Sequence, residues 1–424
     1  MRIIILNPHV NQCGKMVFNW LFRFPQHNKY TYLWEIPSKN DLYETAFLID
    51  GTESSFYQTP YFNNTIAQIP WLLRLFSRLE FWVWCRLNGA FAQKCSVYFN
   101  SNSLDAKNDV IFTFGFTSFK SNLSKYTGIV LVHLSHYHLN TDKISEFFKS
   151  LKNGYILAEG DVSQNGYFKN YFSETINKVY QLPFTFYPGR FKKTKEFNDR
   201  ISKCFASGPM SVPTDNSYIK YYGKSAALNP MRETLYAHKK DINDVVDAYI
   251  YPHDYALTGM RQISSTDKLF TRFAKRNFPA WILTSVLNYK LPYYSFNIVE
   301  KYNEYMMFSS PEERTGLPSM KLLEGVLCGS VLIGIDDPMY TKIGFKDGLN
   351  YISYTENDLD DLKNKIHYYQ NHPDKLSLIA TNGYELVTNK FTPEKVYEFF
   401  WSDMKKLLTT FNENNPQLKN SFLN

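Results

Sequence analysis

Short apolar runs alternate with polar stretches along the first half of this chain, and this alternation constrains the fold most. The runs 128–135 and 154–160 flank "NTDKISEFFKSLKN", a helix candidate capped by Asn140 or Thr141. A strand, a helix and a second strand at this spacing predict a parallel sheet, whose strands are buried on both faces and are therefore apolar throughout. Further strands are predicted at residues 2–7, 109–116 and 178–184.

The second half repeats this pattern, so we predict an α/β fold with two Rossmann-like domains in tandem. Strands are expected at residues 204–210, 305–310 and 330–336, after a polar stretch that contains Pro and Gly at 187–200. Ligands of parallel sheets bind beyond the carboxyl ends of the strands, so we expect the ligand in a cleft between the domains. The expected parts are an N-terminal domain over residues 1–203, a second domain over 204–391, and a helix at the domain junction with a frayed tail over 392–424.

Composition and cysteine spacing argue against several classes of protein. The chain has 424 residues and a formal net charge of +7 without a Lys/Arg-rich arm, so nucleic acid is not an expected partner. Five scattered cysteines without a C-x-x-C pair argue against a disulfide framework or a zinc site. The apolar start lacks the layout of a signal peptide, and no long uncharged apolar run occurs. The expected location is therefore the cytoplasm.

Residues 69–91 come nearest to a membrane segment, but charged side chains interrupt them. On a helical projection, Trp71 and Trp82 share an apolar face, and Arg74 and Arg78 lie on the other side. One interpretation is a helix packed in the core. The other is a helix that lies on the inner surface of the cytoplasmic membrane, with Trp and Arg at the interface, which would give the protein a peripheral membrane contact.

A glutamate in an otherwise apolar helix marks the first candidate site. The helix predicted over 319–328 carries Glu324 among apolar residues, and a buried carboxylate is costly unless a partner compensates it. The preceding loop contains Gly316 and Pro318, where free backbone N–H groups at the start of a helix could bind an anion. A ligand with a phosphate and a ribose would satisfy both ends. Alternatively, Glu324 pairs with Lys321 or lies exposed at a domain edge.

The stretch "GLPSMKLLEGVLCG" resembles the donor site of glycosyltransferases with the GT-B fold, in their group 1-like C-terminal domain. The resemblance covers residues 300–400, and it is to enzymes that build bacterial surface polysaccharides. It implies that Glu324 holds the nucleotide ribose. The second acid of the family pattern falls here on Gly316, and the nearest acids are Glu312 and Glu313. The matching residues are Gly316, Leu317, Pro318, Ser319, Leu322, Glu324 and Gly329, and the candidate nucleotide-binding set also includes Thr315 and Glu313.

Two acids that follow a strand of the first domain are candidate catalytic groups. A carboxylate of Glu159 or Asp161 at this place could deprotonate an acceptor hydroxyl or attack the sugar carbon. The alternative is that both residues cap turns of a loop. Three histidines lie nearby, but the resemblance implies an enzyme without a metal ion, so we expect one of them to line the cleft and the others to be structural: His133, His136 and His138.

Three basic residues before the donor helix are candidates for stabilising a leaving phosphate, which needs cations or N–H donors. They are Lys224, Arg232 and His253. Lys224 and Arg232 could equally be ordinary surface charges. His253 belongs to "PHD", which is similar, in reversed order, to the His-Pro element of transferases that use CMP-sugars.

The resemblance thus implies a transferase without a metal or other cofactor. We expect it to move a sugar from a nucleotide-sugar donor to a glycan or lipid-linked acceptor, and so to extend an O-antigen, a capsule or a lipooligosaccharide, with retention. One alternative is a CMP-Kdo-dependent Kdo transferase of the same fold. An alternative of another class is a non-catalytic scaffold protein that binds a glycan or a nucleotide.

Overall fold

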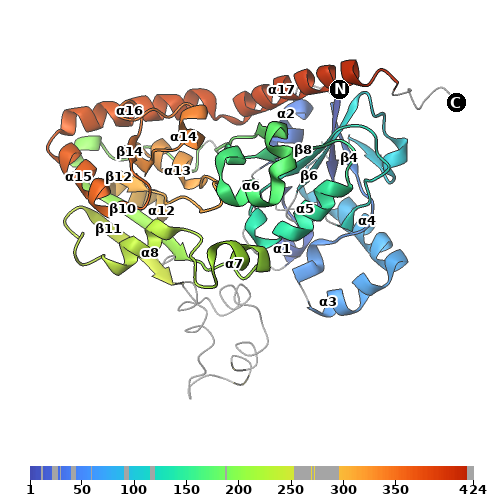
Figure 1. The fold of residues 1–424 in the computed structure, drawn as a ribbon, viewed down its shortest axis with the longest axis horizontal. Helices are drawn as coiled ribbons and strands as arrows, with labels where there is room; N and C mark the ends of the chain where they lie inside the picture. Colours follow the sequence, from blue (N-terminus) through green and yellow to red (C-terminus); the bar gives the residue numbers. More distant parts are fainter. Residues whose placement is uncertain are drawn as a thin grey trace. The chain divides into compact units, whose positions relative to one another are not determined.

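A computed structural model shows two compact units (Figure 1). Unit 1 comprises Met1–Thr185 and Pro393–Asn424, and unit 2 comprises Phe186–Thr392. The residues that the structure describes are 1–10, 13–21, 27–28, 30–39, 44–58, 60–89, 95–114, 120–186, 189–252, 269, 272 and 296–417.

Seven parallel strands form the main sheet of unit 1. The strands are β1 (Arg2–Leu6), β4 (Thr45–Leu48), β5 (Ser96–Tyr98), β6 (Asp109–Phe114), β7 (Val130–His133), β8 (Gly154–Ala158) and β9 (Val179–Gln181). Their order in the sheet is β5-β4-β1-β6-β7-β8-β9, and Ile3 of β1 lies opposite Val110 of β6. The chain builds outwards from β1 in both directions, so the topological switch point of this sheet lies between β1 and β6.

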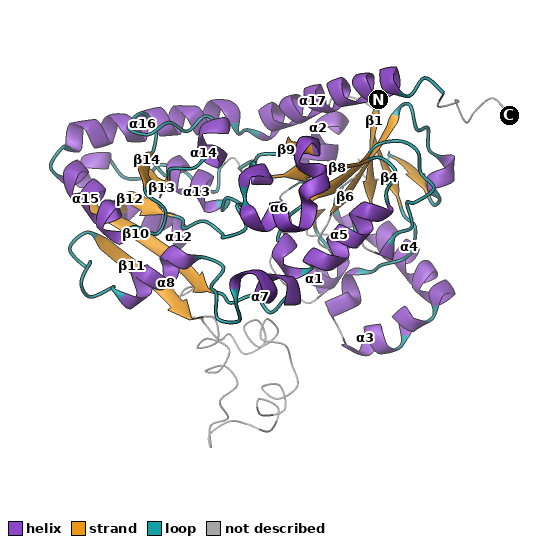
Figure 2. Ribbon diagram, viewed as in Figure 1, coloured by secondary structure: helices purple, strands orange, loops and turns teal. Residues whose placement is uncertain are grey.

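Helices surround this sheet, whose strands run through the middle of the unit (Figure 2). The helices are α1 (Val17–Leu21), α2 (Tyr32–Lys39), α3 (Pro60–Asn64), α4 (Pro70–Leu87), α5 (Thr141–Ser150), α6 (Gly166–Phe172) and α17 (Pro393–Asn414). A small antiparallel pair, β2 (Cys13–Gly14) with β3 (His27–Asn28), stands apart from the main sheet.

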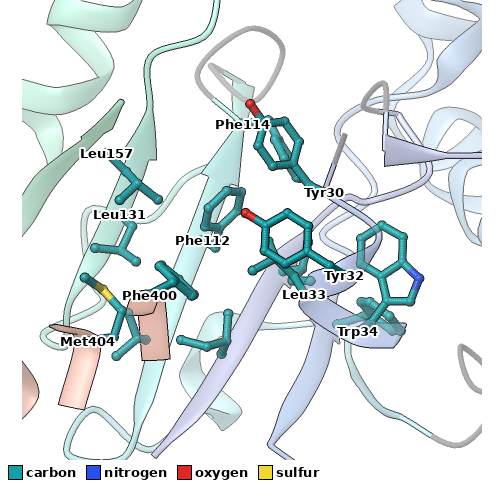
Figure 3. Close-up of a cluster of buried hydrophobic side chains, with 14 of the residues drawn as sticks. Tyr30, Tyr32, Leu33, Trp34, Phe112, Phe114, Leu131, Leu157, Phe400 and Met404 are labelled. Carbon is teal, nitrogen blue, oxygen red and sulfur yellow. The ribbon is translucent and has the colours of Figure 1, made fainter. Parts of the chain in front are cut away.

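The last helix, α17, completes the core of unit 1 although it is far away in sequence. Phe400 and Met404 of α17 lie in the same buried cluster as Leu131 of β7 (Figure 3). The Phe400 ring meets the Phe112 ring of β6 edge-on, with 6.4 Å between the ring centroids. The sheet of unit 1 therefore depends on residues from both ends of the chain.

Unit 2 is built on a second, smaller parallel sheet. Its strands are β10 (Ile201–Met210), β11 (Val246–Pro252), β12 (Tyr305–Ser309), β13 (Val331–Ile335) and β14 (Ile352–Tyr354). They are arranged in the order β11-β10-β12-β13-β14, with the switch point between β10 and β12. The helices are α7 (Asn216–Tyr222), α8 (Pro230–Ala237), α12 (Ile298–Glu304), α13 (Lys321–Leu327), α14 (Pro338–Lys342), α15 (Leu359–Gln370) and α16 (Pro373–Lys390). The predicted α/β class, with two Rossmann-like units, is confirmed.

The change from unit 1 to unit 2 comes earlier than the predicted boundary at 203/204, which falls within β10. The polar segment before β10 is tied to unit 2 by specific hydrogen bonds. Arg200 donates from Nη2 to the carbonyl oxygen of Cys328 at 2.8 Å, and the Thr194 amide donates to Asn303 Oδ1 at 2.7 Å. These hydrogen bonds assign the polar segment before β10 to unit 2. Composition alone does not reveal them.

The helix predicted over 69–91 is α4, and its apolar face is not packed in the core. Trp71 is 67% exposed and Trp82 is 57% exposed, whereas Phe81 and Trp84 are buried. The core-helix interpretation is therefore wrong for the face that carries Trp71 and Trp82, because the sheet packs against the opposite side of the helix. Within the described part of the chain, no helix is both long and apolar enough to cross a membrane.

The role of α17 predicts a contrast between two neighbouring phenylalanines. Phe400 is completely buried and Phe399 is 45% exposed. Phe400→Ala should lower the free energy of unfolding by about 3–5 kcal/mol, because it leaves a cavity in the core. Phe399→Ala should change it by no more than about 0.5 kcal/mol. Urea-induced unfolding measures both, and equal effects would contradict the packing of α17 into unit 1.

Candidate functional site

The carboxyl edge of the sheet in unit 2 holds a buried arginine at the switch point. Arg232 of α8 is only 8% exposed, and its Nη1 donates to the Pro209 carbonyl at 3.1 Å and to Asn229 Oδ1 at 2.9 Å. The guanidinium lies against Gly208, where a Cβ atom would approach Arg232 Cζ to 2.9 Å. Burial lowers the pKa of Arg232, and the carboxylates of Glu313 and Glu312 oppose this effect. A surface position for Arg232, which the sequence left open, is thus excluded.

Asn229 connects this arginine to the segment that follows β12. Its Nδ2 donates to the carbonyl oxygens of Pro311 and Glu312, at 3.1 and 2.9 Å. The side chain of Glu312 points into the body of the unit, where Oε1 accepts hydrogen bonds from the Tyr340 hydroxyl and the Ile335 amide. Burial raises the pKa of Glu312 to about 7. Glu312 therefore serves the packing of the sheet, and Glu313 is the half-buried acid of the pair.

Lys321 and Glu324 occupy the first turn of α13. Lys321 Nζ donates to the carbonyl oxygen of Ser207 at 3.1 Å, so this side chain reaches the C-terminal half of β10. Burial first, and then the positive charge of Arg232, lower the pKa of Lys321 to about 7, while Glu324 acts in the opposite direction. Arg232 and Glu324 are therefore both close enough to Lys321 to influence its charge. Glu324 itself is half-buried.

A glycine lets α13 approach the sheet closely. A Cβ atom at Gly325 would come within 2.5 Å of the Phe308 ring on β12. The apolar sides of α13 are buried as predicted, through Leu322, Leu323, Val326 and Leu327. The helix starts at Lys321, two residues later than predicted. Glu324 is thus fixed on a short helix that packs tightly on β12.

The loop between β12 and α13 contains the remaining predicted nucleotide-binding residues. Gly316 has a φ of 77°, a conformation that side chains rarely adopt, and its amide donates to the carbonyl oxygen of Glu313 at 2.9 Å. Thr315 is fully buried and donates to Glu313 Oε2 at 3.3 Å. Leu317 and Pro318 are buried, whereas Ser319 is half-buried and accepts from the Lys321 amide at 3.3 Å. The loop is therefore built by its own hydrogen bonds around Glu313.

The structure describes only one of the other two predicted phosphate-binding residues. Lys224 is exposed in the turn between α7 and α8. His253 lies outside the described residues. Sequence reasoning did not identify Lys321 as a cation of the site, nor Gly208 and Asn229 as its supports. The position of Lys321 inside the donor motif, between Ser319 and Glu324, was the signal that could have revealed it.

In unit 1, Glu159 lies at the carboxyl edge of the main sheet, as predicted for a residue that follows β8. It is 2% exposed, and its Oε1 accepts a hydrogen bond from the Tyr30 hydroxyl at 2.7 Å. His133, the last residue of β7, places Nε2 3.5 Å from the same oxygen and 3.1 Å from the Tyr30 hydroxyl. The three side chains form a buried polar cluster beside Phe112 and Phe114, whose rings lie around Tyr30 (Figure 3).

Asp161 and His138 are two further candidate polar residues of unit 1. Asp161 Oδ1 accepts from the Ser163 amide at 2.9 Å and so caps the short 3-10 helix Val162–Gln164. His138 is buried, and burial together with the charge of His136 lowers its pKa to about 3. His138 is therefore neutral at physiological pH. Capping, the alternative interpretation of Asp161, is the role that these contacts describe.

The cluster in unit 2 has the chemical groups that a phosphorylated ligand with hydroxyl groups requires. Arg232 and Lys321 provide positive charge at the carboxyl edge, and Glu313 and Glu324 provide hydrogen-bond acceptors. Ligands of open parallel sheets bind at the same place, outside the strand ends at the switch point.

Comparisons with known proteins bear on the same part of the chain. The family model described as "Glycosyl transferase-like" matches residues 289–402. No curated protein sequence matches the chain significantly. Among solved structures, HepE from Anabaena in complex with UDP and glucose is 11% identical, with 96% of this chain and 99% of that chain covered and a TM-score of 0.49. The corresponding values are 12%, 97%, 100% and 0.49 for sucrose-phosphate synthase from Thermosynechococcus elongatus, and 12%, 96%, 98% and 0.44 for a glycosyltransferase from Rickettsia africae ESF-5.

The family match contains α13, the loop before it and β13, and so includes Lys321 and Glu324. The resemblance that the sequence predicted over residues 300–400 is confirmed. Residues 289–402 of this chain are thus similar to the glycosyl transferase-like family.

Proposed function

We propose that this protein is a glycosyltransferase that moves a sugar from a nucleotide-sugar donor to a growing cell-surface glycan, with retention. One observation carries the proposal: the part of the chain that matches the family contains Lys321 and Glu324, and they lie with buried Arg232 at the switch point of a parallel sheet. The acceptor would be an O-antigen, a capsule or a lipooligosaccharide precursor. A lipid-linked acceptor would place the reaction at the cytoplasmic face of the membrane.

In this proposal, unit 2 binds the donor nucleotide. Arg232 and Lys321 stabilise the diphosphate, which gains negative charge when the sugar leaves. Glu324 accepts hydrogen bonds from the two ribose hydroxyls, since an ionised carboxylate has acceptors only. The loop 315–319 approaches the nucleotide with its backbone, and Gly316 with its positive φ shapes this loop.

The acceptor side of the proposal is in unit 1. Glu159 acts as the general base or the nucleophile, and Tyr30 and His133 hold its carboxylate in one orientation. Asp161 is the second candidate, although it caps a turn. The proposal includes no metal or other cofactor, so turnover should be unchanged in excess EDTA.

Glu324 gives the first test. Glu324→Ala should weaken the binding of a nucleotide without its sugar by roughly tenfold to a hundredfold, because a charge-assisted hydrogen bond contributes about 1.5–3 kcal/mol. Glu324→Gln should have a smaller effect, since it keeps one acceptor oxygen. A screen of UDP, GDP, dTDP and CMP selects the nucleotide, and calorimetry measures its affinity. Wild-type affinity in a folded Glu324→Ala variant would refute the donor site.

The lowered pKa of Lys321 predicts that nucleotide affinity depends on pH. Its pKa is about 7, so its ammonium group is charged below pH 7 and loses its proton as the pH rises to 8.5. Affinity for a nucleoside diphosphate should therefore fall about tenfold between pH 6.5 and 8.5, since a charge-assisted hydrogen bond is lost.

Lys321→Met should bind weakly at every pH and lose this dependence. Lys240→Met, which changes an exposed lysine of the same unit, is the matched control and should retain it. A pH profile that is the same in wild type and Lys321→Met would show that Lys321 does not contact the phosphates.

Glu159 gives the test of the acceptor side. Glu159→Gln should keep nucleotide affinity but lower turnover by roughly a hundredfold or more, because amides neither take up protons nor attack carbon. Tyr30→Phe removes one hydrogen bond to the carboxylate and should lower turnover less. If Glu159→Gln lowers the melting temperature and leaves kcat unchanged, Glu159 is a packing residue only.

A further inference from the structure

The outward face of α4 carries an apolar stripe that runs along most of the helix. Its members recur at helical spacing and are between 40% and 67% exposed. The stripe spans 13 of the 18 residues of the helix, from Trp71 to Val83, so it is about 20 Å long. Exposed apolar patches of this extent mark interaction sites. The stripe consists of Trp71, Leu75, Leu79, Trp82 and Val83.

The charge on this face has one sign. The helical projection separates Arg74 and Arg78 from the tryptophans, but neither is buried: Arg74 is exposed, and Arg78 is partly exposed with its guanidinium 4.4 Å from the centre of the exposed Phe99 ring. Arg86 is exposed as well. The only acid of α4, Glu80, is 4% exposed and turned inwards, where it accepts a hydrogen bond from Ser54 Oγ at 2.6 Å. The outward face of α4 therefore combines apolar side chains with positive charge alone.

We propose that α4 lies on a lipid bilayer with anionic headgroups, with the stripe as its contact surface. Tryptophan prefers the interface between headgroups and acyl chains, and arginines beside it attract anionic lipid. Contact with the bilayer covers the apolar side chains while the charged groups stay at the headgroups. The helix is too charged to cross the membrane.

A second copy of this chain fits the stripe less well. In a symmetric dimer the same patch meets itself, so each arginine would face a like charge or its close neighbour. No acid of α4 is available on that face to compensate them. Charge complementarity thus favours an anionic surface over self-association.

The inference deepens the proposed function, because a lipid-linked acceptor would lie at the same surface. Its test needs neither sugar nor nucleotide. Failure of vesicle binding would leave the nucleotide site of unit 2 intact, and failure of nucleotide binding would leave the stripe intact, so the two outcomes are distinguishable.

Co-sedimentation of the full chain with vesicles tests the proposal. Vesicles of phosphatidylcholine with about 30% phosphatidylglycerol should bind the protein, and about 0.5 M salt should release most of it. Pure phosphatidylcholine vesicles should bind it much more weakly. Changing the three arginines of α4 to Gln should weaken binding roughly a hundredfold, at about fivefold for each charge.

Two sets of variants separate the stripe from general surface properties. Trp71→Ala combined with Trp82→Ala should weaken binding roughly tenfold or more, because both rings lose apolar contact with lipid. Phe399→Ala, an exposed aromatic of α17, should bind as wild type does. The control for charge changes three exposed lysines of α17 to Gln, and it should have little effect: Lys395, Lys405 and Lys406.

Three outcomes would overturn the proposal. The first is wild-type protein that does not co-sediment with anionic vesicles. The second is a tryptophan variant that binds like wild type, with an unchanged melting temperature. The third is a concentration-dependent dimer in sedimentation velocity that the tryptophan variant abolishes, because a second copy of the chain would then cover the stripe.

Discussion

The buried guanidinium of Arg232 determines how the edge of unit 2 is built. A charged group inside a protein is costly unless hydrogen bonds and opposite charges compensate it. Here the carbonyl oxygen of Pro209 and the amide oxygen of Asn229 accept its hydrogen bonds, and Glu313 and Glu312 oppose the loss of its charge. These partners come from β10, from the start of α8 and from the loop after β12. The arginine therefore holds three segments together at the point where a ligand of such a sheet is expected.

This arrangement also sets the chemistry of Lys321. Burial and, after it, the positive charge of Arg232 disfavour a second cation here, and together they lower the pKa of Lys321 to about 7. A phosphorylated ligand would reverse that balance and favour the charged lysine. In unit 1 the buried group is an acid, Glu159, and it already has polar neighbours. The Tyr30 hydroxyl donates to its carboxylate, and His133 lies beside the same oxygen.

Local sequence patterns predicted the strands and helices that are apolar on both faces. They predicted few of the features that depend on contacts between residues far apart in sequence. Strands β1, β6 and β8 lie where their apolar runs predict them, and so does the helix that carries Glu324. The four-residue strand β4 was missed because a short apolar run forms a strand only beside its partner β1. Whether the face of α4 with Trp71 and Trp82 is buried was left open for a related reason. Periodicity distinguishes the two faces of a helix, but packing against the sheet decides which of them is buried. The hydrogen bond of Lys321 is to Ser207, more than a hundred residues away in sequence, and no local pattern indicates it.

Hydrogen–deuterium exchange of the full chain, with and without the nucleotide that binds, tests the location of the donor site most directly. Each segment of the cluster contains backbone amides whose exchange slows when a ligand covers or rigidifies them. The account predicts slower exchange in residues 207–211, 229–232 and 312–324, and a smaller effect when Glu324 is replaced by Ala. Protection elsewhere in the chain, with none in these three segments, would contradict it.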